Sequence, residues 1–326
     1  MKAEEASPNS PPWRGGTAVP GWFSSGDFMN IPKHITYTDA QVIEKGWSDD
    51  KKYRLTTADG QQLLLRVSAL AEHDRKQAEF NLLTRAYQHG VCTAQPIKFG
   101  LCDEGQCVYQ LCTWLPGEDV KTAMTHMNAL EQYDLGQKAG ALLRCLHTLP
   151  APEDVEPWER WFLRKMQDRL DFYHSHPIKS SGGDIAVRFL QENKAWLSDR
   201  PQCFLHGDFN QTNLILQPSG QVGVIDFNAY NKDHGDPWWE FDPVNWGGEV
   251  NARYNSGLIN GYFDGKPPQA FFRMFAYYNA YCALAALCDS SQHNQGTPEE
   301  GRRHLENILN WHDDFNQLTP SWYLSC

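Results

Sequence analysis

The chain has 326 residues, of which 41% are hydrophobic and 21% charged, and its formal net charge is −11. This balance is typical of a globular enzyme long enough for two lobes, and it excludes a disordered or fibrous chain. The negative charge, with no basic cluster, argues against a nucleic-acid binder. No run approaches the roughly 18 apolar residues of a transmembrane helix, so no membrane partner is expected.

The acidic residues near the N-terminus and the spacing of the cysteines predict the cellular location of the protein. Glu4 and Glu5 stand where a secretory signal would need a basic and then an apolar segment, so a cytoplasmic location is expected. The nine cysteines form no Cys-x-x-Cys pair, which favours reduced thiols. Cys102, Cys107 and Cys112 nevertheless recur every five residues, which leaves a zinc site open.

The first third of the chain reads as an extension followed by a strand-rich lobe. Residues 1–35 are rich in proline and glycine, and residues 36–113 alternate short apolar runs with one helical pattern. Asp59-Gly60 between two alternating runs predicts a hairpin. The predicted elements are a strand near 43–47, the hairpin at 53–67, a helix at 73–90, and strands at 97–100 and 107–114.

After a linker at 114–119, the pattern of residues 120–326 becomes helical. Leu135, Ala139 and Leu146 recur on one helical face, which is the mark of a helix packed on a core. Further helices are predicted at 154–174, 184–198, 249–262, 268–288 and 297–318, interrupted by a hairpin at 213–227. We therefore expect an α+β, two-lobed chain with a small N-lobe sheet and a mainly helical C-lobe.

The candidate chemistry is concentrated in residues 204–227. Asp208 is followed by Asn213 five residues later and by Asp226 eighteen residues later. Phosphoryl transfer needs a carboxylate that orients the attacking hydroxyl and ligands for a metal ion that neutralises phosphate charge. Carboxylate and amide oxygens are ligands that Mg²⁺ accepts. The spacing thus predicts a base and two metal ligands, because the hairpin returns the chain to the loop.

These residues resemble a known family. His206–Asn213 (HGDFNQTN) resembles the HGDxxxxN catalytic loop of the aminoglycoside phosphotransferase (choline kinase-like) family, and Asp226 stands in a segment like its metal-binding IDF/IDW. Residues 235–241 resemble the GDP-containing stretch that follows in this family. The resemblance implies a protein-kinase-like fold, ATP or GTP as donor and Mg²⁺. It also implies that Asp208 is the base and that Asn213 and Asp226 are the magnesium ligands.

The resemblance also implies a nucleotide site in the N-lobe. It would combine a phosphate loop, a basic residue on the third strand and a glutamate on the next helix. The loop here has one glycine, and an arginine stands where many family members have lysine. The predicted nucleotide-binding residues are Gly46 and Ser48 in the loop, Arg66, Glu79, and Thr113 and Leu115 at the linker.

The acceptor is predicted from charge. Residues 201–326 hold 14 Asp and Glu against 6 Lys and Arg, a balance of −8, which would attract a cationic acceptor. Asp236 and Glu240 are the candidate acceptor contacts, although Asp236 is also a candidate for holding the catalytic loop. Aromatic residues of this region could enclose a quaternary ammonium, but their helical spacing favours core packing. A kinase for choline, homoserine or a sugar-like alcohol, and a non-catalytic nucleotide-binding protein, remain the alternatives, with the oligomeric state open.

Overall fold

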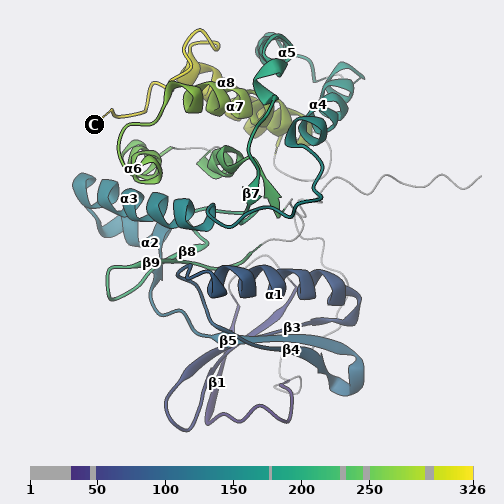
Figure 1. Cartoon of the computed structure of the whole chain (residues 1–326), viewed down its shortest axis with the longest axis vertical. Helices are drawn as coiled ribbons and strands as arrows, with labels where there is room; N and C mark the ends of the chain where they lie inside the picture. Colours follow the sequence, from purple (N-terminus) through teal and green to yellow (C-terminus); the bar gives the residue numbers. More distant parts are fainter. Residues whose placement is uncertain are drawn as a thin grey trace, which may run out of the picture.

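The computed structural model describes residues 31–44, 49–175, 178–227, 233–244, 250–290 and 297–325. Figure 1 shows a sheet-rich lobe below and a helical lobe above, with helix α1 (His73–Gln88) between the sheet and the upper lobe. The predicted α+β architecture of two lobes is confirmed. No helix in these ranges is long and apolar enough to cross a membrane.

The N-lobe is built on a five-stranded sheet in which every neighbouring pair is antiparallel. The predicted hairpin is present, and Gly60 in its turn has a φ of 81°, a backbone conformation that glycine adopts without strain. In the order β1-β2-β3-β5-β4, the strands are β1 (Asp39–Ile43), β2 (Lys51–Thr56), β3 (Gln62–Ala69), β5 (Cys107–Thr113) and β4 (Pro96–Cys102).

The two faces of this sheet differ in character. One face buries an apolar cluster that includes Tyr53 and Leu65, and Ile31 and Ile35 pack into the same cluster. Residues 31–35, which the sequence assigns to the extension, therefore contribute to the N-lobe core. The alternate positions of β2 and β3 point to the opposite face, because successive side chains of a strand alternate.

The lobes are joined through residues 114–117. The short strand β6 (Glu118–Asp119) already pairs with β8 (Leu214–Leu216) of the C-lobe, and β8 pairs with β9 (Val222–Val224). Gly117 has a φ of 140°, and a Cβ atom there would lie 2.2 Å from the Leu216 carbonyl oxygen. The close approach of the linker to β8 therefore requires glycine at this position.

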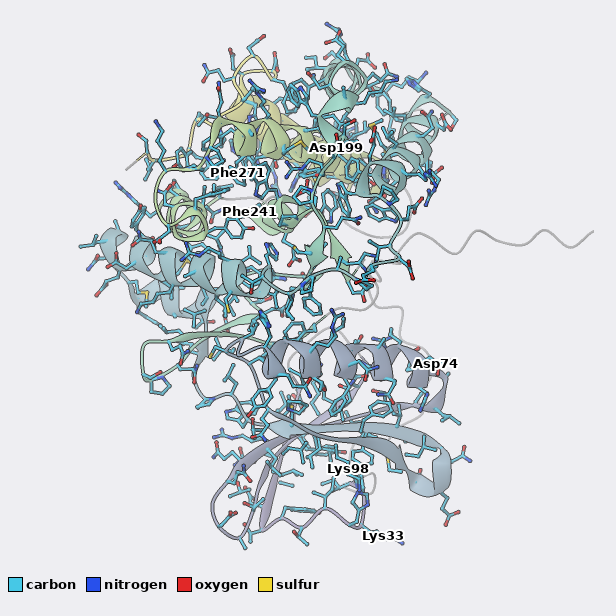
Figure 2. The ribbon with its side chains drawn as sticks, viewed as in Figure 1. Lys33, Asp74, Lys98, Asp199, Phe241 and Phe271 are labelled. Carbon is cyan, nitrogen blue, oxygen red and sulfur yellow. The ribbon has the colours of Figure 1, made fainter. Side chains whose placement is uncertain are left out.

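The C-lobe consists mainly of helices. Phe241 and Phe271 lie close together in its core, with ring centroids 5.0 Å apart, whereas Lys33 and Asp74 lie near the outline of the N-lobe (Figure 2). The elements not yet named are α2 (Val120–Ala123), α3 (Ala129–Leu146), α4 (Trp158–Ser175), α5 (Ser181–Glu192), β7 (Cys203–Phe204), β10 (His234–Gly235), α6 (Ala252–Phe263), α7 (Gln269–Asp289) and α8 (Pro298–His312), with 3-10 turns η2 (Leu70–Glu72), η3 (Asp103–Gly105), η4 (Met124–His126), η5 (Lys194–Leu197) and η6 (Pro237–Val244).

Helices α3 and α6 are in direct backbone contact. A Cβ atom on Gly136 would lie 2.1 Å from the Tyr254 carbonyl oxygen, and one on Gly257 would lie 2.1 Å from the Tyr133 carbonyl oxygen. Gly140 and Gly261, each four residues further on, make equally short approaches. Glycines at this spacing lie on one helical face, so the two helices pack without side chains between them.

Three predicted helices differ at their ends. Helix α4 begins at Trp158 rather than at 154, directly after Pro157, and α5 covers Ser181–Glu192 instead of 184–198. Helix α8 ends at His312 rather than 318, because Asp313 has a φ of 48° and caps it in the left-handed conformation. Hydrophobic spacing continues past this point, but the backbone turns away from the helix.

Candidate active site

The catalytic loop lies between β7 and β8. Gly207 has a φ of 83°, which explains the glycine before the predicted base. The Asp208 carboxylate accepts hydrogen bonds from Asn210 Nδ2 (2.7 Å) and Asn213 Nδ2 (2.9 Å), one on each oxygen. Burial raises the pKa of Asp208, the two amides lower it, and the net pKa lies above the ordinary value. The carboxylate is therefore held in one orientation by two neutral donors.

His206 holds the backbone of this loop. Its Nε2 donates to the Ile225 carbonyl oxygen at 2.9 Å, and its Nδ1 accepts from the Asp208 N–H at 3.2 Å. One nitrogen donates and the other accepts, so the ring is neutral with its proton on Nε2. The side chain is fully buried. His206 therefore fixes the loop through hydrogen bonds to two backbone groups.

Glu240 supports the same backbone from below. Its carboxylate accepts from the His206 N–H and the Gly207 N–H, both at 2.7 Å, and His147 Nε2 lies 3.4 Å away. Burial raises the pKa of Glu240, but His147 and the hydrogen bond from the His206 N–H outweigh it and the net pKa is lowered. Both oxygens are thus engaged by protein donors, and a contact of Glu240 with the acceptor remains a prediction.

Asp236 is also structural. Its two oxygens accept from Arg200 Nε (2.5 Å), Arg200 Nη2 (2.9 Å), Tyr278 Oη (2.6 Å) and the Trp238 N–H (2.9 Å), and the side chain has no exposed surface. The Arg200 guanidinium also lies over the Trp238 ring, 4.0 Å from its centre. The prediction that Asp236 contacts the acceptor is wrong for this geometry, because a buried carboxylate with four donors offers no oxygen to a ligand.

The two predicted metal ligands come from the loop and from the end of the hairpin. The Ile225 N–H donates to the Asn213 carbonyl oxygen at 2.9 Å, which brings Asp226 next to Asn213. Asp226 has a φ of 62°, an uncommon conformation that aspartate tolerates better than most residues. Burial raises its pKa, but Arg66 and Lys52 outweigh this and the net pKa is lowered.

This donor set fits Mg²⁺. The Asn213 amide nitrogen is engaged by Asp208, so the oxygen is the atom that can face a cation, and Asp226 supplies an ionised carboxylate. Mg²⁺ prefers such oxygen ligands and keeps several waters. In the described ranges no three or more His, Cys, Asp and Glu side chains gather as metal ligands. The spaced cysteines accordingly form no zinc site there, and burial raises the pKa of Cys112 to about 11.

Arg66 and Glu79, which we expect to form an ion pair when a nucleotide is bound, have other partners in this structure. Arg66 Nη2 donates to Asp226 Oδ1 across the junction of the lobes, while Glu79 pairs with Arg75 at 2.6 Å and with Lys76 at 3.2 Å. A pair of Arg66 and Glu79 remains a prediction for the nucleotide-bound state. Gly46 and Ser48 lie outside the described residues.

The linker residues lie at the end of β5. Thr113 is bonded to Gln95 through both its N–H and its hydroxyl oxygen, at 2.9 and 2.8 Å. Leu115 packs against Gly223 of β9, where an added Cβ atom would lie 2.8 Å from its Cδ2. A nucleotide contact by either residue remains a prediction.

Three charged residues that the sequence did not single out join this region. Lys76 bonds Asp50 at 2.6 Å, with side-chain exposures of 2% and 5%, and Ser68 also donates to Asp50 at 2.7 Å. Lys52 is 7% exposed, and Arg66 and Asp226 act on its charge. The available signal was the position of Asp50 and Lys52 within the segment expected to form the phosphate loop.

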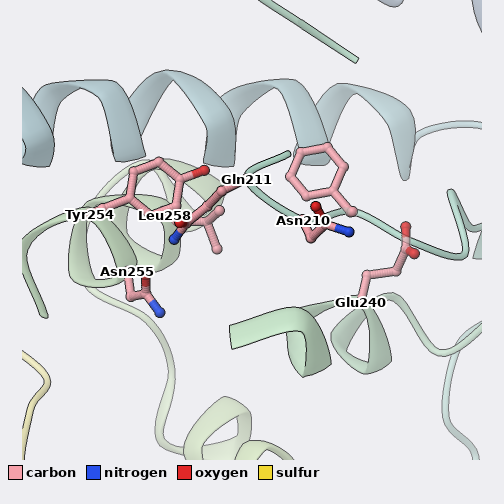
Figure 3. A pocket seen from close by; sticks show the side chains of 7 residues that line it. Asn210, Gln211, Glu240, Tyr254, Asn255 and Leu258 are labelled. Carbon is pink, nitrogen blue, oxygen red and sulfur yellow. The ribbon is translucent and has the colours of Figure 1, made fainter. Parts of the chain in front are cut away.

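A small pocket adjoins the catalytic loop (Figure 3). Asn210, which bonds Asp208, and Glu240 lie on one side, and Tyr254 and Asn255 of α6 lie on the other. Tyr254 Oη and Asn255 Oδ1 are buried, and neither has a hydrogen-bond partner among the described residues. The residues that line the pocket are Phe209, Asn210, Gln211, Glu240, Tyr254, Asn255 and Leu258.

Comparison with known proteins identifies the family of this chain. The model of the phosphotransferase enzyme family (APH) matches residues 39–272, and the chain belongs to this family. A hydroxylysine kinase from Danio rerio is 24% identical over 255 residues, which cover 70% of this chain and 67% of the relative. A putative aminoglycoside phosphotransferase from Ralstonia eutropha has a TM-score of 0.59 at 16% identity, covering 85% of this chain and 94% of its own.

A choline/ethanolamine kinase family protein from Mesorhizobium loti has a TM-score of 0.58 at 16% identity, covering 86% of this chain and 92% of its own. These matches confirm the protein-kinase-like fold and the resemblance seen in the catalytic loop. The protein is an enzyme, a small-molecule phosphotransferase.

Proposed function

We propose that the protein transfers the γ-phosphate of ATP to a hydroxyl of a small molecule that carries an amine, with Asp208 as the base. The observation that carries this proposal is the Asp208 carboxylate, oriented by Asn210 and Asn213 next to Asp226. A carboxylate in this position can orient the acceptor hydroxyl and accept its proton. GTP as donor is the alternative that a nucleotide comparison resolves, and a cytoplasmic location remains a prediction.

Asn213 and Asp226 would hold Mg²⁺, which neutralises phosphate charge when it is bound. Asp226→Ala should abolish Mg²⁺-dependent transfer while circular dichroism shows an intact fold. A variant that transfers normally would contradict the metal assignment.

The acceptor class is inferred from the pocket beside the loop. Asn255 Oδ1 requires a hydrogen-bond donor, whereas the Tyr254 hydroxyl can either donate or accept a hydrogen bond. Leaving such buried groups unpaired costs about 1–3 kcal/mol each, so an acceptor gains from them if one of its amine or hydroxyl groups enters this cavity of about 20 Å³. The ionised Glu240 at the same pocket favours a positive group. An ammonium group supplies both the hydrogen-bond donor and the positive charge, and a hydroxyl supplies the donor. Hydroxylysine and ethanolamine, which appear in the names of two of the similar proteins, carry both groups.

An aromatic cage for choline has less support. The rings of Tyr277, Tyr278 and Tyr281 are at most 4% exposed and pack in the C-lobe core, as their helical spacing predicts. Primary amines are therefore favoured over quaternary ones.

An acceptor panel tests the proposal. ADP release coupled to NADH oxidation should be measured with 5-hydroxylysine, ethanolamine, choline, kanamycin, a neutral sugar and an anionic sugar phosphate. We expect transfer to primary amino alcohols or aminoglycosides, with rates that fall as salt screens the attraction. Preference for the anionic acceptor would overturn the charge argument. Nucleotide binding without transfer to any acceptor would favour the non-catalytic alternative.

A further inference from the structure

Two basic residues lie side by side on the face of the N-lobe sheet that meets the C-lobe. Lys52 of β2 and Arg66 of β3 are register partners in an antiparallel pair. Residues directly opposite one another project to the same face. The adjacent pair, Tyr53 and Leu65, projects into the apolar cluster on the other face. Since Arg66 reaches Asp226 of the C-lobe, Lys52 also lies on the side of the candidate active site.

Lys52 is almost fully enclosed there. Only 7% of the residue is exposed, and its charge interacts with Arg66, Asp226 and Asp50. Burying a lysine next to an arginine is unfavourable unless anions compensate. The neighbouring Lys76 is already bonded to Asp50 and Glu79, so those carboxylates are shared with another cation. Positive charge is therefore gathered on this face beside the proposed metal ligand.

We propose that Lys52 is a second phosphate-binding cation, which together with Arg66 holds the phosphates of the bound nucleotide from adjacent strands. The inference rests on the proposed function, because the metal ligands locate the phosphates next to Asp226. A metal ion held by Asp226 would occupy the carboxylate that Arg66 now bonds, and the phosphates would supply anions for both cations.

The two side chains differ in what they offer. The guanidinium of Arg66 is planar and can donate two parallel hydrogen bonds to one phosphate, whereas the ammonium of Lys52 is a compact charge on a flexible chain. The ligand class is a nucleoside di- or triphosphate with a divalent cation. A nucleoside without phosphates gains nothing from Lys52.

Calorimetric titration of the full chain with Mg²⁺·ATP, Mg²⁺·ADP and adenosine tests the inference. Lys52→Met should weaken ATP and ADP binding by about 10- to 100-fold, the loss of a hydrogen bond between charged groups, and leave adenosine binding unchanged. Lys52→Arg should keep affinity within about 3-fold of the wild-type value, because it retains the charge.

Lys51→Met is the matched control. It removes the same charge one residue earlier, but Lys51 is the register partner of Val67, which belongs to the apolar face. Its nucleotide affinities should equal those of the wild-type protein. Thermal unfolding of each nucleotide-free variant checks that the N-lobe remains folded.

Two results would overturn the inference. Either Lys52→Met binds ATP as tightly as the wild-type protein, or it loses adenosine and ATP affinity equally, which would mean a distorted sheet. Failure of the proposed function would look different, since the wild-type protein itself would then bind ATP without transferring phosphate to any acceptor.

Discussion

The two sides of the candidate active site are stabilised in opposite ways. On the C-lobe side, Asp208, His206 and Glu240 are bonded to amide groups or to backbone atoms of the same lobe. On the N-lobe side, Arg66 and Lys76 are bonded to carboxylates, and the Arg66 partner, Asp226, belongs to the other lobe. The C-lobe side is therefore preformed, whereas the N-lobe side is held by ion pairs that a nucleotide and its metal would rearrange.

The largest effect is expected at the preformed side. Asp208→Asn should lower turnover by about 10²–10⁴-fold, because asparagine cannot accept the hydroxyl proton. Nucleotide affinity should change little, since the neutral side chain leaves the phosphate contacts in place. Steady-state rates with the best acceptor, with ATP binding measured in parallel, check this. Near-normal turnover of this variant would contradict the assignment of Asp208 as the general base.

The helix pair behind the preformed side should tolerate no added methyl group. Gly257→Ala should lower the free energy of unfolding by about 3 kcal/mol, because its Cβ atom would overlap the backbone of α3. Gly182→Ala in α5 is the control, since its nearest neighbours are flexible leucine methyl groups. Urea denaturation measures both, and equal stabilities would show that α3 and α6 can separate without cost.

Glu240→Gln separates loop support from acceptor binding. The glutamine amide would face one backbone N–H as a second donor, so turnover should fall about 10-fold and stability by about 2 kcal/mol. The exposed Glu306→Gln is the control. A rise in acceptor KM with unchanged turnover and stability would instead make Glu240 an acceptor contact.

Acid should weaken the C-lobe through His312. Burial lowers the pKa of this histidine from 6.5 to about 4, so the folded state binds its proton less readily than the unfolded state. Its contribution to stability is complete above pH 6.5 and is lost as pH falls toward 4. The loss should reach about 2 kcal/mol at pH 5. Urea denaturation at pH 7.5 and 5 should show a smaller loss for His312→Gln than for the exposed control His126→Gln.

The smallest effect is expected on the N-lobe side, which is held by ion pairs. Arg66→Met should tighten Mg²⁺ binding to the nucleotide-free protein by about 3- to 10-fold, because the guanidinium no longer competes for Asp226. Titration with Mg²⁺ alone measures it. Unchanged or weaker binding would mean that the ion pair does not oppose the metal.

Local sequence was sufficient for the elements whose geometry depends on neighbouring residues. Asp59-Gly60 predicted the β2–β3 hairpin, and the spacing of Asp208 and Asn213 predicted a loop whose side chains bond one another. Helix ends were less predictable. Asp313 stops α8 through its left-handed backbone conformation, while the apolar spacing continues beyond it.

The partners of the charged residues were decided by the tertiary structure. The sequence by itself determined the family and the two-lobed fold, and it predicts the catalytic loop, because these depend on short spacings. The bond of Arg66 to Asp226 spans 160 positions, and that of Glu240 to the His206 N–H spans 34. A carboxylate can bind a substrate, a metal ion or a backbone N–H group. Only the packing of distant segments decides which of these partners it has. For this reason the sequence left Asp236 with two candidate roles, of which packing against Arg200 selects the structural one, and Lys52 emerges only from its place beside Arg66.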